Sequence, residues 1–156
     1  MSSSFNRITV LGAGVLGAQI SFQIAHRGFE VATYDISDAA LKQARQRFDG
    51  IAAAYPTEVA GATEAAVQET IERIRFTTEL AAAVQGADLV IEAVPESLEL
   101  KRDVIARIPA FAPPAAVVVT NSSTLLPSDL MDSTGRPDRF WGCTSPTTSG
   151  STTLPR

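Results

Sequence analysis

Three glycines follow a short apolar segment near the start of the chain, and this arrangement restricts the fold more than any other feature. Residues 8–11, Ile-Thr-Val-Leu, have the composition of a buried parallel strand. Gly12, Gly14 and Gly17 come next in the spacing G-x-G-x-x-G. Such glycines allow a tight turn, the approach of a pyrophosphate to the backbone, and close packing of a helix on a sheet. The pattern predicts a phosphate site at the free N–H groups of a helix that begins near Val15.

The segments that follow extend this pattern to a dinucleotide fold. Residues 20–26 continue as a helix that Gly28 ends, and residues 30–34 form a second strand that leads into Asp35. Asp35 follows Gly17, the last glycine of the motif, at close to the spacing of about 20 residues that is typical of the acid that binds the adenosine ribose hydroxyls. Because a carboxylate there repels a 2′-phosphate, the pattern predicts NAD as the cofactor.

The composition indicates one globular domain. The chain has 156 residues, of which 45% are hydrophobic and 19% charged, and this is enough for one core. A net charge of −4 argues against nucleic acid or an anionic membrane surface as a partner. No apolar run approaches the ~20 residues that span a bilayer, and residues 1–6 show no signal-peptide pattern. We therefore expect a cytoplasmic protein.

The chain has one cysteine, Cys143, and one histidine, His26. A single cysteine excludes an internal disulfide, and the two residues offer no metal cluster, so we predict no metal site. Cys143 is interpreted as an incidental thiol. His26 falls in the last turn of the first helix, where it is expected to cap the negative helix end rather than to act in catalysis.

The rest of the chain alternates helices with strands. Residues 37–55 have helical spacing with Ser37 or Asp38 as the cap, Pro56 is expected to interrupt this helix, and residues 63–73 form another. The two make a helical arm that either reaches a substrate or merely covers the sheet. Further strands are expected at residues 74–77, 87–93 and 116–120, with helices at 79–84 and 98–111. This alternation predicts an α/β fold with a Rossmann-type doubly wound parallel sheet.

Polar residues follow three of the predicted strands. Asp35 follows the second, Glu96 and Lys101 the fourth, and residues 121–124 (Asn-Ser-Ser-Thr) the fifth. Ligands of such sheets bind beyond the carboxyl ends of the strands, so these residues are predicted to converge on the cofactor. The alternative is that Glu96 and Lys101 are solvated residues at a helix start and that residues 121–124 form an ordinary turn.

Four segments resemble the NAD-binding domain of 3-hydroxyacyl-CoA dehydrogenases, and the match covers residues 7–140. They are residues 8–17 (ITVLGAGVLG), 87–96 (ADLVIEAVPE), 121–125 (NSSTL) and 136–140 (RPDRF). The resemblance implies oxidation of an L-3-hydroxyacyl-CoA, such as 3-hydroxybutyryl-CoA, to the 3-ketoacyl-CoA by hydride transfer to NAD. It also implies an acyl-CoA substrate as partner and a dimer in the complete family members.

The resemblance also assigns residues. Its cofactor contacts fall on Gly12, Gly14, Leu16 and Gly17 for the pyrophosphate, Asp35 for the adenosine ribose, and Glu96, Lys101 and Ser123 around the nicotinamide half. Ser123 is also the family's substrate-facing serine, which bonds the reacting oxygen. The helical arm of residues 37–73 resembles the part that embraces the CoA tail.

The resemblance stops after Phe140. The family continues with a His-Phe-Phe-Asn or His-Phe-Ala-Asn motif, whose histidine is the general base, and with a glutamate that assists it. By alignment these two residues fall at Thr144 and Arg156. A hydroxyl is too weakly basic and a guanidinium stays protonated, so neither serves as the base at neutral pH. The chain as written lacks the catalytic pair.

A lost base after the codon for Phe140 explains this. Codons can be chosen for residues 141–156 that, in a shifted frame, encode the family motif. From position 142 on they spell Gly-Leu-His-Phe-Ala-Asn-His-Val-Trp-Val-Asn-Asn-Thr-Ala-Glu, with histidine at position 144 and glutamate at position 156. We therefore expect an NAD-binding domain at residues 1–140, an out-of-frame tail at 141–156, and no helical C-terminal domain of the family. A genuinely divergent tail is the alternative.

Two other functions fit the sequence. An intact cofactor half beside a missing base is also the pattern of a non-catalytic NAD-binding module. Dehydrogenases of the gulonate type share much of the same motif pattern, so the chain also fits a fragment of such an enzyme.

Overall fold

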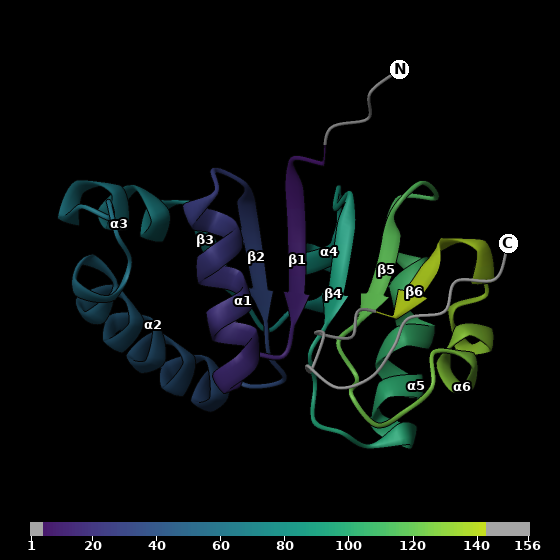
Figure 1. Cartoon of the computed structure of the whole chain (residues 1–156). Coiled ribbons are helices and arrows are strands. Elements are labelled where there is room, and N and C mark those ends of the chain that lie inside the picture. The colour runs from purple at the N-terminus through teal and green to yellow at the C-terminus, as the bar shows by residue number, and fades with distance from the viewer. Residues whose placement is uncertain (1–4, 143–156) are drawn as a thin grey trace, which may run out of the picture.

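The computed structural model describes residues 5–142, and within them the strands form one parallel sheet in the order β3-β2-β1-β4-β5-β6 (Figure 1). The central strand β1 pairs through Ile8 with Val31 of β2 and with Leu89 of β4. The strand order reverses between β1 and β4, which confirms the predicted doubly wound sheet. The strands are β1 (Arg7–Leu11), β2 (Glu30–Tyr34), β3 (Ile74–Thr77), β4 (Leu89–Glu92), β5 (Val117–Thr120) and β6 (Phe140–Gly142).

Helices cover both faces of the sheet (Figure 1). One face carries α1 (Val15–His26), α2 (Asp38–Glu58) and α3 (Glu64–Glu72), and α2 and α3 are the helical arm predicted between the second and third strands. The other face carries α4 (Leu80–Val84) and α5 (Leu98–Arg107), with α6 (Ser128–Met131) beside α5. Short 3₁₀ turns complete the chain: η1 (Ile108–Ala110), η2 (Asp132–Thr134) and η3 (Pro137–Arg139).

The predicted break at Pro56 is wrong, because α2 continues through Pro56 to Glu58. Proline lacks the N–H group that would bond the preceding turn, but Pro56 lies in the last turn of the helix, so one hydrogen bond is lost. The Val59 N–H still donates to the Tyr55 carbonyl at 3.0 Å. The Tyr55 ring is buried against Phe22 of α1, with 4.9 Å between ring centroids. This packing keeps the last turn helical.

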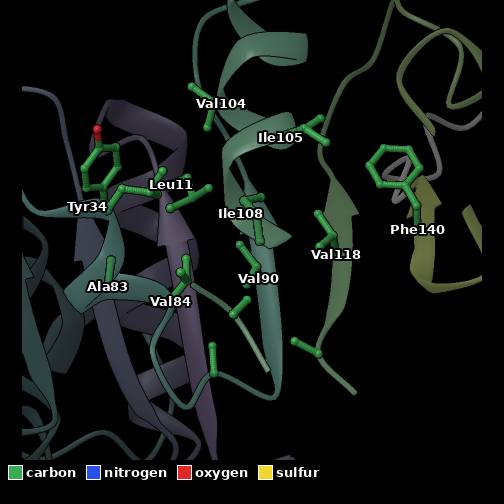
Figure 2. Close-up of a cluster of buried hydrophobic side chains, with 14 of the residues drawn as sticks. Leu11, Tyr34, Ala83, Val84, Val90, Val104, Ile105, Ile108, Val118 and Phe140 are labelled. Atoms are coloured by element: carbon green, nitrogen blue, oxygen red, sulfur yellow. The ribbon is translucent and has the colours of Figure 1, made fainter. Parts of the chain in front are cut away.

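The core has apolar clusters on both faces of the sheet. Neighbouring residues of β1 alternate between the faces, so Val10 contacts the side of α1 and Leu11 the side of α4. Figure 2 shows the second side, where Val90 and Val118 of the strands meet Ile105 of α5. Both faces are covered, which explains why the strands read as nearly continuous apolar runs. In the part of the chain that the structure describes, no helix has the length and apolar character needed to cross a membrane.

We expect Phe22→Ala to destabilise the domain strongly. Phe22 is fully buried and packs its ring against Phe48 and Tyr55 of α2. Removal of a buried aromatic ring leaves a cavity and costs about 3–5 kcal/mol. Urea unfolding followed by circular dichroism measures the free energy of unfolding. Phe111→Ala is the matched control because Phe111 is 48% exposed, and an equal loss in the two variants would contradict the assignment of Phe22 to the core.

Candidate cofactor and active site

The glycine turn after β1 combines two crowded positions with an open one. Gly12 has a φ of 99°, and a β-carbon there would lie 2.6 Å from the Ala93 carbonyl oxygen. A β-carbon on Gly17 would collide with the Gly12 carbonyl oxygen, so α1 packs closely on β1 only with glycine at this position. At Gly14, apart from its own atoms and its two chain neighbours, no atom of the described chain lies within 4 Å of a β-carbon position. The space beside Gly14 is therefore room for a ligand that approaches the backbone.

α1 begins at this space without the side-chain cap that α2, α3 and α5 have. Gly14 is its N-cap residue, no side chain caps it, and its first turn contains no acid. In contrast, α2, α3 and α5 each have a capping serine or threonine and an acid in the first turn. Val15 and Leu16 of the first turn are exposed. Uncapped N–H groups and the positive end of the helix dipole thus face the open space, and these features fit a pyrophosphate.

Asp35 follows β2 and holds the glycine turn from the other side. Its Oδ2 accepts a hydrogen bond from the Ala13 N–H at 2.8 Å, and its Oδ1 accepts one from the Ile36 N–H at 2.8 Å. The carboxylate remains partly exposed. Each oxygen has further acceptor capacity, so ribose hydroxyls can donate to it. The geometry is compatible with the predicted ribose contact.

A buried ion pair lies at the end of β4. Lys101 Nζ donates to Glu92 Oε1 at 2.8 Å, and the two side chains are 1% and 0% exposed. Glu92 accepts two further hydrogen bonds, from the Val94 N–H at 2.8 Å and from the Thr120 hydroxyl at 2.6 Å. Sequence reasoning predicted Lys101 for the site but missed Glu92. An acid that ends the apolar strand of residues 89–92 was the signal that could have found it.

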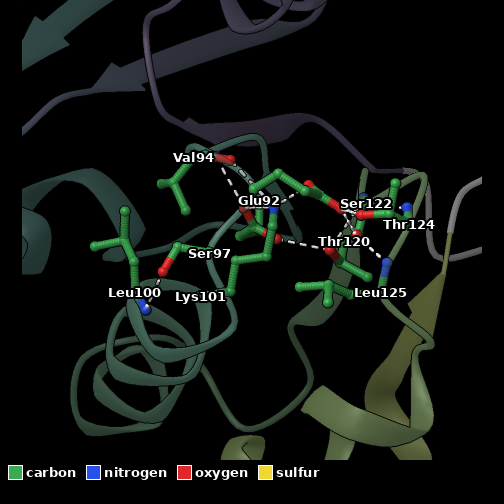
Figure 3. Close-up of polar contacts among 10 residues, drawn as sticks. Glu92, Val94, Ser97, Leu100, Lys101, Thr120, Ser122, Thr124 and Leu125 are labelled. Atoms are coloured by element: carbon green, nitrogen blue, oxygen red, sulfur yellow. Dashed lines mark hydrogen bonds and ion pairs between the residues drawn. The ribbon is translucent and has the colours of Figure 1, made fainter.

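Glu96 joins this ion pair to the turn after β5. Figure 3 shows Glu92 and Lys101 of the pair beside Ser122 and Thr124 of the turn. Its Oε2 lies 3.3 Å from Lys101 Nζ. Its Oε1 accepts hydrogen bonds from the Ser122 hydroxyl, from the Thr124 N–H at 3.2 Å and from the Thr124 hydroxyl at 2.7 Å. Desolvation raises the pKa of Glu96, but these hydrogen bonds and the charge of Lys101 outweigh it and lower the pKa to about 2. Glu96 is therefore ionised at neutral pH.

Ser123 lies between the two residues that Glu96 holds, and its side chain is exposed. The structure thus brings Glu96, Lys101 and the turn of residues 121–124 together at the carboxyl edge of the sheet, as the sequence predicts. The direct contacts with Glu96 come from Ser122 and Thr124 rather than from Ser123. Spacing alone did not reveal which serine of the pair turns inward.

Other residues singled out in the sequence lie elsewhere. His26 is at the far end of α1, where its Nδ1 lies 3.0 Å from the Thr70 hydroxyl and its ring contacts Tyr55 edge-on. It has a structural role there, away from the glycine turn. The predicted positions of the catalytic pair, Thr144 and Arg156, lie outside the described residues, as does Cys143.

Residues 7–144 match the family model of the 3-hydroxyacyl-CoA dehydrogenase NAD binding domain. The chain belongs to this family. The match contains the glycine turn, the uncapped start of α1 and Asp35, all of which fit NAD as the cofactor. The family and the cofactor predicted from the sequence are thus confirmed.

The similar proteins include enzymes with different substrates. A probable 3-hydroxyacyl-CoA dehydrogenase of Caenorhabditis elegans is 31% identical over 90% of this chain and 47% of its own length. An L-carnitine dehydrogenase of a Pseudomonas species is 36% identical over 83% of this chain and 39% of its own length. The solved structure of a diketoreductase, which acts on dicarbonyl compounds, superposes on this chain with a TM-score of 0.87 and 54% sequence identity. The match covers 90% of this chain and 50% of the diketoreductase chain. The chain therefore spans about half the length of these relatives, or less.

We expect Glu96 to stabilise the domain at neutral pH and to lose this effect in acid. Its pKa is lowered from 4.5 to about 2 on folding, so the stabilisation is complete well above pH 4.5 and is lost as the pH falls toward 2. Because the side chain is 37% exposed, solvent screening keeps the effect small. Thermal unfolding of wild type and Glu96→Gln at several pH values measures the difference in Tm.

The control is Glu99→Gln, which changes an exposed acid three positions further on, in the first turn of α5. Its Tm relative to wild type should vary little over the same pH range. A Tm difference between wild type and Glu96→Gln that stays constant from neutral pH to about pH 2 would contradict the lowered pKa.

Proposed function

We propose that this protein is of the 3-hydroxyacyl-CoA dehydrogenase type, an NAD-dependent oxidoreductase that converts an L-3-hydroxyacyl-CoA to the 3-ketoacyl-CoA, and that the chain as given is catalytically incomplete. The observation that carries the proposal is that a space for a phosphate and a cluster of ionised side chains lie at the same edge of the sheet. The open space beside Gly14 suits a pyrophosphate, and the ionic cluster of Glu92, Lys101 and Glu96 stands at the neighbouring strand ends. The C. elegans relative supports the substrate class. A dimer and a cytoplasmic location for the complete protein stay predictions.

The chain's residues have distinct roles in the proposed reaction. When bound, NAD supplies the acceptor for the hydride that leaves the hydroxyl-bearing carbon of the substrate. The N–H groups at the start of α1 hold the pyrophosphate, and Asp35 binds the adenosine ribose. Glu96 lies beside the nicotinamide half, and the buried Lys101 holds it there. The exposed Ser123 hydroxyl donates to the reacting oxygen and orients it.

The reaction also needs a general base for the hydroxyl proton. Glu96 is poorly suited, because a carboxylate with a pKa of about 2 retains a proton only weakly at neutral pH. The family's base aligns with Thr144, which cannot serve. We infer that this chain binds the cofactor without turning over substrate. The chain would then act as a non-catalytic NAD-binding module.

Calorimetric titration with NADH tests the cofactor half. We expect wild type to bind NADH and Gly14→Ala to bind at least about tenfold more weakly, because the added methyl group fills the space for the pyrophosphate. Asp35→Ala should weaken binding as well. Gly14→Ala should still fold, with at most a modest loss of Tm for alanine at the N-cap, since its methyl group meets no described atom beyond the chain neighbours. NADH binding that none of these changes affects, or no binding by a folded wild type, would contradict the proposal.

Reduction of acetoacetyl-CoA is followed in the same samples. Binding without turnover is the expected result for the chain as written. Turnover by the purified chain would exclude a non-catalytic NAD-binding module and show that another group acts as the base.

We infer further that the tail of residues 141–156 arises from a shifted reading frame. The support is the spelling of the family motif in the shifted frame, with histidine at position 144. Trp141 and Gly142 of this segment lie in β6 and pair with Val119 and Thr120 of β5. Sequencing of the gene from genomic DNA should show an insertion or deletion just after the codon for Phe140, followed by a family-like frame. An uninterrupted gene without such a frame downstream would refute the inference.

A dicarbonyl substrate without CoA is the second candidate. The diketoreductase is 54% identical to this chain, and the helical arm of residues 37–73 contains six acidic and four basic residues. Such an arm attracts the phosphates of CoA weakly. Two of the basic side chains are already engaged, because Arg45 lies over the Phe76 ring and Arg73 pairs with Glu69. A full-length protein with the frame restored, assayed with acetoacetyl-CoA, an uncharged diketone and gulonate, separates these candidates.

A further inference from the structure

The turn that carries Ser123 is fixed by one carboxylate. Glu96 accepts hydrogen bonds from Ser122 on one side of Ser123 and from Thr124 on the other. The Ser122 hydroxyl oxygen in turn accepts from the Leu125 N–H at 3.0 Å. The position of Ser123 therefore depends on where Glu96 is held.

Glu96 is held by Lys101, whose ammonium group is itself fixed. Three acceptors surround Lys101 Nζ: Glu92 Oε1 at 2.8 Å, the Val94 carbonyl at 3.1 Å and Glu96 Oε2 at 3.3 Å. An ammonium group has three protons, so these contacts use all of them. Because Lys101 is almost fully buried, the carboxylates replace water in stabilising its charge.

Glu92 is the innermost member of this chain of contacts (Figure 3). Its carboxylate receives donors from three parts of the fold: Lys101 on α5, Thr120 on β5 and the Val94 N–H after β4. The Thr120 hydroxyl oxygen also accepts from the Ser122 N–H at 3.3 Å. Glu92 thus reaches the turn by two routes, one through Lys101 and Glu96 and one through Thr120.

We propose that Glu92 is a positioning residue, which sets the place of Ser123 at the site through Lys101, Glu96 and Thr120. Glu92 is fully buried, so it acts through these neighbours and does not touch cofactor or substrate. The inference rests on the proposed function for the role of Ser123 toward a substrate. The arrangement of the turn itself does not depend on that function.

Amide hydrogen exchange measured by NMR on the full chain tests the proposal. Glu92→Gln keeps the shape of the side chain and removes its charge. We expect the Thr124 and Leu125 amides to exchange about tenfold faster than in wild type. Amides of β2, such as Val31, should accelerate by no more than the loss of global stability in urea predicts. Uniform acceleration across the chain, or an unchanged turn, would overturn the proposal, because a merely structural role gives one of these results.

Two further variants keep the test decisive. Glu96→Gln interrupts the same chain of contacts at its exposed end and should give the same local acceleration, so an unchanged turn there overturns the proposal even where Glu92→Gln does not fold. Glu99→Gln, which lies on α5 with Lys101, should leave the turn as in wild type. NADH titration of the same samples separates the two claims: wild type that fails to bind NADH refutes the proposed function, whereas the exchange result still decides the role of Glu92.

Discussion

The close contact between α1 and the end of β1 is the constraint on which the rest of the structure depends. Because Gly17 has no side chain, the backbone of α1 meets the Gly12 carbonyl directly. This approach carries Phe22 into the cluster with α2 and fixes the line of the helix across the sheet. It also places the first turn of α1 beside the open space at Gly14. A single backbone contact therefore serves both the packing of the domain and the geometry of the proposed phosphate site.

The two halves of the site are built by different physical means. Around β1 and β2, backbone groups and one partly exposed carboxylate, Asp35, border the open space beside Gly14. Around β4 and β5, a buried ion pair and its hydrogen bonds fix side chains in place. The first arrangement suits an extended anion, which needs room and donors. The second suits orientation of a small reacting group, which needs rigid neighbours.

Most of the fold could be predicted because the strands are short apolar runs between clear helix signals. The bounds of β2 and β3 and the cap at Ser37 agree with the structure. Pro56 was misjudged because the burial of Tyr55, which keeps the last turn of α2 helical, is a tertiary effect that local sequence does not contain.

The candidate site was predictable only in part. The glycines, Asp35, Glu96 and Lys101 stand at positions fixed by motif spacing. Glu92 was missed because its partners lie 9 and 28 positions away, at Lys101 and Thr120, and their meeting depends on how α5 and β5 pack. The inward direction of Ser122 was also hidden, since neighbouring serines in a turn differ in orientation and not in composition.

The burial of the Glu92–Lys101 pair makes the two halves of the site differ in their response to ionic strength. Salt at physiological concentration screens exposed charges over about 8 Å, so it weakens surface pairs such as Arg7 with Glu30 and Arg107 with Asp103. A pyrophosphate at the open start of α1 meets the same screening. The Glu92–Lys101 pair is closed to water and dissolved ions. The Glu92–Lys101 pair therefore keeps its geometry in concentrated salt, while binding of phosphates at the proposed site beside α1 becomes weaker.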